Sequence, residues 1–187
     1  MNTKKKNRRI IGIDPGTNIL GFAILDVQGN SLSIVEMNVL YMKHLETHTE
    51  KLKHILFELQ AVIDKYSPTE MAIEAPFFGK NVQSMLKLGR AQGVAMAAGL
   101  SKNLIVKEYA PREIKQSVTG KGNASKEQVY AMLKTIFNKK IEQEYLDSSD
   151  ALAAAVCHYF KSKNAITGGK RYNSWSSFVK ENPKKKL

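Results

Sequence analysis

The chain has 187 residues, of which 43% are apolar, and this is enough for one domain with a buried core. No apolar run reaches the roughly 18–20 residues that a membrane-spanning helix requires. Most of the net charge of +12 lies in the first nine residues and after residue 162, so the body of the chain is close to neutral.

These changes in composition divide the chain into three parts. We expect a basic N-terminal extension over residues 1–8, one folded domain over residues 9–162 and a basic, flexible tail over residues 163–187. The single cysteine, Cys157, argues against a disulfide framework and fits a reducing cytosol.

The first half of the chain predicts four strands and one helix. In chain order these are strands at residues 9–14, 21–27 and 31–40, a helix from Leu52 to Tyr66, and a short buried strand at residues 70–74. The second half predicts one further strand among helices. These are a helix at residues 81–100, a strand at residues 104–108, a helix from Pro111, a helix capped by Ser125 and Gln128, and a final helix at residues 147–161.

Four acidic residues lie in unusually apolar surroundings. Asp14 ends the first predicted strand, Glu74 ends the fourth, and Asp147 and Asp150 open an Ala-rich helix. Buried carboxylates are costly unless they are paired or bind a cation, and no basic residue is adjacent to them in sequence. Asp147 and Asp150 are three residues apart and share a helix face, although Asp147 alone also suits a helix cap. Together the four predict a Mg²⁺ site, and two such ions suit phosphodiester hydrolysis.

The element order, with acids on the first strand, the fourth strand and the last helix, is typical of one fold. It predicts an α/β, ribonuclease H-like domain with a mixed five-stranded sheet flanked by helices. Residues 80–126 carry nine Lys or Arg against two acids, whereas residues 36–74 carry a net negative charge. A basic face beside a carboxylate cluster indicates an enzyme that acts on nucleic acid.

Two further patterns have both a functional and a structural interpretation. Phe77 and Phe78 follow Glu74, and one of them could stack on an unpaired base while the other packs in the core. The helix at residues 81–100 is rich in Gly and Ala, which suits close packing against a second copy of the chain or against its own sheet. His158 lies eight residues after Asp150, about 12 Å along a helix, so we expect a structural role for it.

Four blocks of sequence resemble the RuvC family of Holliday junction resolvases. Their motifs are IGIDPGT at residues 11–17, AIE at 72–74 with LKLGRAQG at 86–93, EYAPREIKQ at 108–116 with GKG at 120–122, and DSSDALA at 147–153. The resemblance spans about residues 9–160 in unbroken order. A lone GIDPGT would be weak, because actin-like ATPases carry a similar loop.

The resemblance implies a homodimeric endonuclease of the bacterial cytoplasm that nicks four-way DNA junctions in recombination and repair. It implies Asp14, Glu74, Asp147 and Asp150 as catalytic metal ligands for two Mg²⁺, with Mn²⁺ as a substitute, and RuvA and RuvB as possible partners. It also implies Phe77 as the stacking residue and Lys115 and Lys126 near the cleaved phosphates. With the basic loop around Gly120, the predicted DNA-binding residues are Phe77, Phe78, Lys80, Arg112, Lys115, Lys121 and Lys126.

Three alternatives remain at this point. One is a ribonuclease H-like nuclease that acts on another branched or hybrid nucleic acid. A second is an actin-like phosphate-binding protein, although such proteins use two domains of this kind. A third is an inactive nucleic-acid-binding module, but loss of at least one acid would be expected there. No membrane association is expected.

Overall fold

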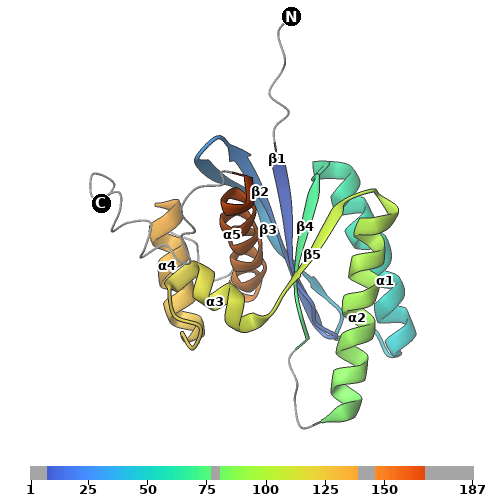
Figure 1. Cartoon of the computed structure of the whole chain (residues 1–187). Coiled ribbons are helices and arrows are strands. Elements are labelled where there is room, and N and C mark those ends of the chain that lie inside the picture. The colour runs from blue at the N-terminus through green and yellow to red at the C-terminus, as the bar shows by residue number, and fades with distance from the viewer. Residues whose placement is uncertain (1–7, 77–80, 139–145, 167–187) are drawn as a thin grey trace, which may run out of the picture.

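The computed structural model describes residues 8–76, 81–138 and 146–166 (Figure 1). The strands are β1 (Arg8–Asp14), β2 (Ile19–Gln28), β3 (Ser31–Tyr41), β4 (Glu70–Glu74) and β5 (Ile105–Tyr109). The helices are α1 (His48–Tyr66), α2 (Val82–Ser101), α3 (Pro111–Thr119), α4 (Lys126–Phe137) and α5 (Leu146–Ile166). Each predicted element is present within these residues, with ends that differ by a few residues from those expected.

The five strands form one mixed sheet in the order β3-β2-β1-β4-β5. β1, β2 and β3 are an antiparallel meander, whereas β4 and β5 run parallel to β1. β1 is therefore the central strand, and β1 and β4 end at the same edge of the sheet. The predicted mixed five-stranded sheet is confirmed.

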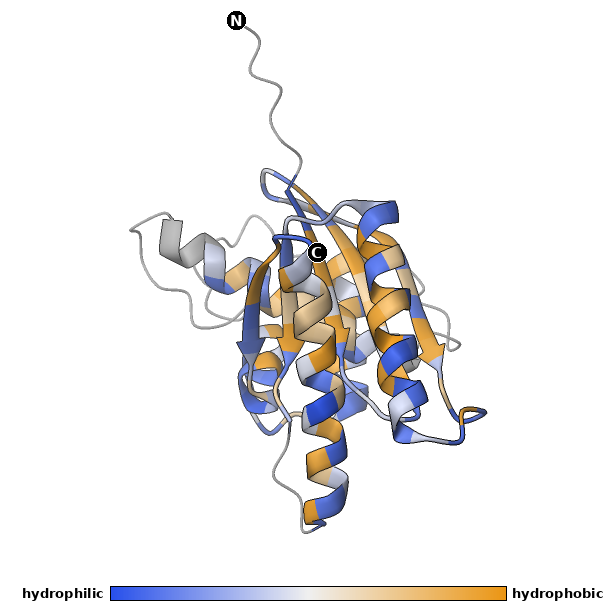
Figure 2. Cartoon of the chain, turned by 90° about the vertical axis from the view of Figure 1, so that its right-hand side faces the viewer, coloured by the Kyte–Doolittle hydropathy of each residue, from blue (hydrophilic) through white to orange (hydrophobic). Residues whose placement is uncertain are grey.

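Helices cover both faces of the sheet, which gives three layers (Figure 1). α1 and α2 pack on one face, against side chains such as Ile11 and Ile13 of β1. α3, α4 and α5 pack on the other, against side chains such as Ile10 of β1 and Ala72 of β4. Figure 2 shows apolar strands behind α1 and α2, whose residues alternate between hydrophobic and hydrophilic. Because β1 is covered on both faces, its central residues form an unbroken apolar run, as parallel strands between helices do.

α5 lies directly on β1, and a glycine makes this contact possible. A Cβ atom added to Gly12 would lie 2.0 Å from the carbonyl oxygen of Ala151 and 3.0 Å from the Cβ of Ala155. The Ala-rich sequence of α5 and the missing side chain of Gly12 therefore let helix and strand approach at backbone distance. This approach brings the start of α5 beside the end of β1.

Local signals explain several helix ends. Ser125 and Gln128 form the expected capping box at the start of α4, with Gln128 N–H donating to Ser125 Oγ over 3.3 Å and Ser125 N–H donating to Gln128 Oε1 over 2.9 Å. Gly120, at φ 79°, ends α3 in the left-handed region. Cys157 is buried in the core. Within the part of the chain that the structure describes, no helix is long and apolar enough to cross a membrane.

Candidate active site

Two of the predicted acids lie side by side because their strands pair in parallel. Ile13 of β1 is in register with Ile73 of β4, so Asp14 and Glu74 are the next residues of neighbouring strands. Side chains alternate between the faces of a strand, and Gly12 and Ala72 face α5. Asp14 and Glu74 therefore share the face that α5 covers, and both are half-buried.

α5 supplies the third described carboxylate. Asp150 precedes Ala151, the residue whose carbonyl lies against Gly12, and its side chain is 27% exposed. The charges of Asp14 and Asp150 both raise the pKa of Glu74, so the three carboxylates lie close enough to interact. Asp147 is in the first turn of α5, but its side chain lies outside the described part of the chain.

A tight turn removes the chain from the end of β1. A Cβ atom on Gly16 would lie 1.8 Å from the carbonyl oxygen of Ile19, so only glycine fits there. The chain thus turns sharply after Asp14 and returns as β2.

The pKa of Glu74 reflects burial and the negative charges gathered at this edge of the sheet. Burial raises its pKa, the negative charges of Asp14 and Asp150 raise it further, and Lys115 and Lys126 lower it, with a net pKa of about 8. Burial and like charges both disfavour an ionised carboxylate. The cluster therefore holds less negative charge at neutral pH than three isolated carboxylates would.

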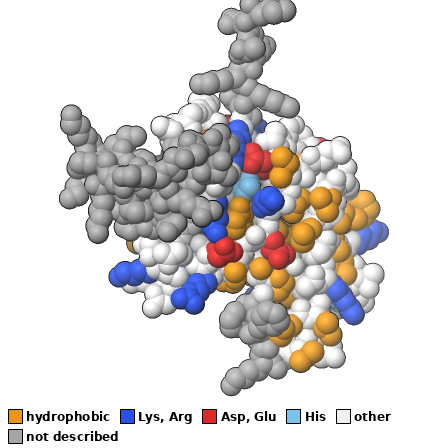
Figure 3. Space-filling model, viewed as in Figure 1, with side chains coloured by type: hydrophobic (Ala, Val, Ile, Leu, Met, Phe, Trp, Pro, Cys, Tyr) orange, Lys and Arg blue, Asp and Glu red, His pale blue; other side chains and the backbone are white. Residues whose placement is uncertain are grey.

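Two of the predicted phosphate-binding lysines border the acids. Lys126, at the start of α4, places its Nζ 2.8 Å from Oδ2 of Asp150. Lys115, on α3, is half-buried and lies close enough to lower the pKa of Glu74. The sequence did not reveal these counter-ions of the acids, because both lysines come from elements that are distant in the chain. On the side of the molecule seen in Figure 3, acidic and basic side chains lie near one another around the middle of the surface.

The other predicted DNA-binding residues lie on α3, in the loop after it, or outside the described residues. Arg112 and Lys121 are exposed, and Arg112 packs over Gly122, where an added Cβ would lie 2.7 Å from its Cγ. Hydrogen bonds hold the loop around Gly120: Gln116 Nε2 donates to Gly120 O over 2.8 Å, and Lys121 N–H donates to Thr119 Oγ1 over 3.1 Å. Phe77, Phe78 and Lys80 lie outside the described residues.

The carboxylates are donors of the kind that a hard cation takes. Three carboxylates converge, and a divalent ion among them would relieve the repulsion that raises the pKa of Glu74. Among the described side chains, no group of three or more His, Cys, Asp or Glu is arranged to hold a metal ion. The side chain of Asp147 lies outside the described part of the chain, and Asp150 forms an ion pair with Lys126.

Sequence reasoning missed one residue that holds this edge of the sheet. Gln92 of α2 is buried, its Nε2 donates to a carboxylate oxygen of Glu108, and the same atom lies 3.5 Å from the carbonyl oxygen of Glu74. Ala75 N–H also donates to Tyr109 O over 2.8 Å. A glutamine among the small and apolar residues of α2 was the available signal.

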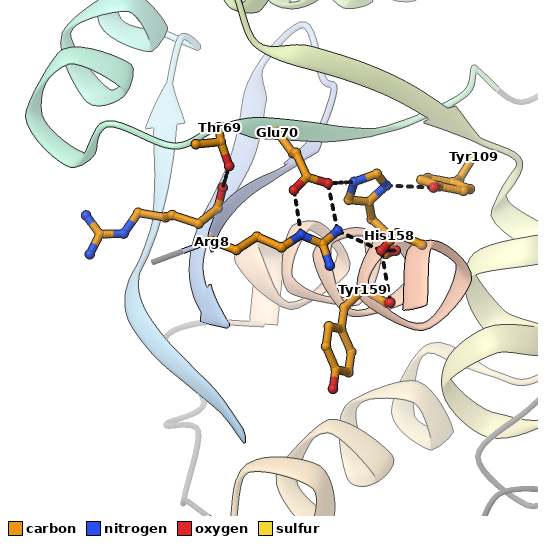
Figure 4. A network of polar contacts seen from close by, with 8 residues as sticks. Arg8, Thr69, Glu70, Tyr109, His158 and Tyr159 are labelled. Atoms are coloured by element: carbon orange, nitrogen blue, oxygen red, sulfur yellow. Dashed lines mark hydrogen bonds and ion pairs between the residues drawn. The ribbon is translucent and has the colours of Figure 1, made fainter. Parts of the chain in front are cut away.

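His158 has the structural role expected of it. It is 3% exposed, its Nδ1 lies 2.7 Å from the hydroxyl of Tyr109, and its Nε2 lies 2.6 Å from Oε2 of Glu70 (Figure 4). Arg8 binds the same carboxylate, with its Nη2 2.7 Å from Oε2. This network joins β1, β4, β5 and α5, and its member on β5, Tyr109, is in register with Glu74.

The sheet order, with carboxylates from β1, β4 and the last helix at one edge of the sheet, is that of the ribonuclease H-like class of nucleases. A family model described as "Crossover junction endodeoxyribonuclease RuvC" matches residues 10–158. Two bacterial proteins of that name are 54% identical (Christiangramia forsetii, 97% of this chain and 94% of the relative) and 50% identical (Porphyromonas gingivalis, 96% and 97%).

Among solved structures, Thermus thermophilus RuvC in complex with a Holliday junction substrate matches with a TM-score of 0.78. That match has 28% sequence identity and covers 84% of this chain and 96% of the other. The chain therefore belongs to the RuvC family of crossover junction endodeoxyribonucleases, which are metal-dependent nucleases.

Proposed function

We propose that this protein resolves four-way DNA junctions by paired, symmetric nicks. The observation that carries the proposal is the convergence of Asp14, Glu74 and Asp150 on the α5 side of the sheet edge, with the pKa of Glu74 raised to about 8. Family membership supports the substrate, because relatives carry the name crossover junction endodeoxyribonuclease.

Asp14, Glu74, Asp147 and Asp150 would hold two Mg²⁺ ions, or Mn²⁺ in their place. When bound, such ions supply a nucleophilic water and stabilise the leaving 3′ oxygen. The chain orients these carboxylates through the β1–β4 register and the contact of α5 with Gly12. The half-burial of Asp14 and Glu74 limits the water that competes for the ligands.

Lys115 and Lys126 would bind the phosphates next to the cleaved bond. Both lie close enough to the acids to lower the pKa of Glu74, so a phosphate there would meet the carboxylates and the lysines together. Lys126 would exchange Asp150 for the DNA. Arg112 and Lys121, farther along the same side, and Lys80 would contact the backbone at a distance from the cut. Phe77, or Phe78 in its place, would stack on a base at the junction centre.

Paired nicks require two active sites, and α2 offers a surface for a second copy of the chain. One stripe of its exposed surface is apolar or small at helical spacing, through Val82, Leu86, Gly89, Gly93 and Leu100, and the exposed Lys87 and Arg90 lie beside it. Val82, Leu86 and Leu100 are 65%, 52% and 58% exposed, and no atom lies within 4 Å of a Cβ built on Gly89 or Gly93. Figure 2 shows hydrophobic residues along this helix. We propose a homodimer through this face, acting in the bacterial cytoplasm, with RuvA and RuvB as candidate partners.

The test compares cleavage and binding in the same protein. Asp14→Asn should reduce cleavage of a four-way DNA junction in Mg²⁺ by at least about a thousandfold, because the carboxylate that orients the reacting groups is lost. Junction affinity in Ca²⁺ should change little. Glu36→Gln, on β3 away from this edge, is the matched acidic control and should cut normally. Cleavage by Asp14→Asn at the wild-type rate would refute the metal site.

The substrate is tested by comparing cutting of a four-way DNA junction, a plain DNA duplex and an RNA–DNA hybrid of the same sequence. Only the junction should be nicked efficiently, in two opposing strands. Preferred cleavage of the hybrid would favour the alternative of a ribonuclease H-like enzyme with another substrate. Sedimentation near twice 20.9 kDa at micromolar concentration would support the dimer.

A further inference from the structure

A second basic cluster lies on the opposite face of the sheet from Lys115 and Lys126. It consists of His48 and Lys51 in the first turn of α1 with Lys87 and Arg90 of α2, and Lys87 and Arg90 are exposed. Burial lowers the pKa of His48, and the charges of Arg90, Lys87 and Lys51 lower it further. α1 and α2 pack against each other on this face of the sheet, so the four basic residues come from neighbouring helices.

This cluster lies at the same edge of the sheet as the acids. β3 runs parallel to β1, because each pairs antiparallel with β2, so α1 begins at the edge where β1 ends. α2 begins at that edge too, because it follows the end of β4. Lys51 Nζ donates to Asn18 Oδ1 over 2.7 Å, and Met42 N–H donates to Asn18 O over 2.8 Å. Asn18 belongs to the turn that follows Asp14, so the cluster is tied to the loop of the active site.

The cluster also contains a buried polar atom without a partner. Nε2 of His48 is buried and has no hydrogen-bond partner among the described residues. A buried imidazole nitrogen without a hydrogen-bond partner costs free energy that a polar partner would recover. The nearby acid Glu50 does not fill this role, because its carboxylate accepts from Thr47 N–H over 2.9 Å in the capping box.

We propose that His48, Lys51, Lys87 and Arg90 form a second phosphodiester-binding site, which holds the DNA backbone of a junction arm on the α1–α2 side of the acids. This inference rests on the proposed function and extends it. The acids would then lie between two basic groups, Lys115 and Lys126 on one side and this cluster on the other. A DNA strand that crosses the active site would be bound by basic residues on both sides of the cleaved bond. These contacts would fix the position of the strand relative to the carboxylates.

The site would also contribute to junction selectivity. A duplex arm is a straight polyanion, whereas two arms of a junction diverge from one point. Basic groups on both faces of the sheet edge can contact both arms of a junction, but a single straight duplex engages them less completely. Loss of the cluster should therefore weaken binding of a junction more than binding of a duplex.

The experiment measures affinity against salt with the full chain in Ca²⁺, using a fluorescent four-way junction and a duplex of the same length. Lys87→Gln combined with Arg90→Gln should weaken junction binding about tenfold at low salt and reduce the salt slope by about one to two, since each phosphate contact contributes about 0.9. The matched control removes the same charge elsewhere, with Lys65→Gln and Lys134→Gln, whose ammonium groups lie over the rings of Tyr66 and Tyr130. The control should retain the wild-type slope.

A direct measurement guards against indirect effects of the substitutions. In wild-type protein, bound junction should protect Lys87 from an amine-acylating reagent, read by mass spectrometry, and should leave Lys65 reactive. If Lys87 reacts equally with and without DNA, and the double variant keeps the wild-type salt slope, the second site does not exist. A change in sedimentation of the double variant would instead assign the cluster to assembly and overturn the proposal. Wild-type protein that neither binds nor cuts junctions would refute the proposed function instead.

Discussion

Glu70 and Glu74 lie at the two ends of the same short strand, on the same face, and their carboxylates behave in opposite ways. Burial alone would raise the pKa of Glu70, but hydrogen bonds and charge from His158 and Arg8 lower it to about 2. Burial raises the pKa of Glu74, and Asp14 and Asp150 raise it further, to about 8. One carboxylate has its partners inside the protein, and the other is surrounded by more acids.

Glu70 therefore stabilises the fold, whereas the charge of Glu74 is left for a bound ligand to compensate. Glu70 joins β4 to β1 through Arg8 and to α5 through His158, so its charge is satisfied without any bound group. Glu74 is satisfied only in part, by Lys115 and Lys126 nearby. Perturbed pKa values gather at functional sites because chemistry needs charges that the fold leaves uncompensated. If the two ends of β4 are independent, a change at one end should leave the other end undisturbed.

The largest effect is expected at Gly12, which lies between the two ends. In Gly12→Ala the new Cβ would meet a backbone carbonyl at 2.0 Å, and neither β1 nor α5 can yield without moving the other. We expect a loss of about 3 kcal/mol or more in the free energy of unfolding, and loss of cleavage in whatever protein still folds. Urea unfolding measures the first and junction cleavage the second. Ala61→Val adds bulk on an exposed part of α1 and should change both little; equal effects would contradict the packing argument.

The next largest effect is expected at Glu70. Glu70→Gln removes the charge that pairs with Arg8 and accepts from His158, and we expect a loss of about 2–3 kcal/mol at pH 7. A lowered pKa contributes stability above pH 4.5, and this contribution disappears as the pH falls toward 2. The gap between wild type and variant should therefore close below about pH 4. Cleavage should stay within about twofold, because Glu70 is four residues, about 13 Å along the strand, from Glu74.

The sequence predicted the acid end of this comparison better than the other end. Asp14 and Glu74 stand out because each ends an apolar run, and strand alternation with the parallel register is enough to bring them together. The Glu70 network could not be predicted, because Arg8, His158 and Tyr109 come from three elements whose packing decides the contact. The sheet was predictable from turn signals and periodicity. The pairing of Lys126 with Asp150 was not, since it depends on how α4 docks beside α5.

A smaller effect, of opposite sign, is expected at Glu74. Between pH 4.5 and about 8 the folded protein keeps a proton on Glu74 that the unfolded chain has released, so stability without divalent ions should fall as the pH rises through this window. Glu74→Gln removes this penalty and should be more stable than wild type at pH 8.5 by on the order of 1–2 kcal/mol. Unfolding at pH 5.5 and 8.5, with and without Mg²⁺, measures it. Mg²⁺ should raise the stability of wild type more than that of the variant; a variant destabilised at both pH values would contradict the repulsion.

The smallest effect is expected at Gln92, which touches only the acid end. Gln92→Ala leaves Glu108 without its amide donor and frees the carbonyl of Glu74, so the end of β4 should lose definition. We expect a stability loss of about 1 kcal/mol and a severalfold lower rate of cleavage at saturating enzyme, with junction affinity unchanged, because the carboxylate is misplaced while the DNA contacts remain. Gln60→Ala is the matched control: its Nε2 donates to Ser101 Oγ over 3.0 Å on the exposed side of α1 and α2. If both variants slow cleavage equally, Gln92 acts through general stability and not through the position of Glu74. If only Gln92→Ala slows it, and added Mg²⁺ partly restores the rate, the ends of β4 are held independently: by Arg8 and His158 at Glu70, and by Gln92 and the metal at Glu74.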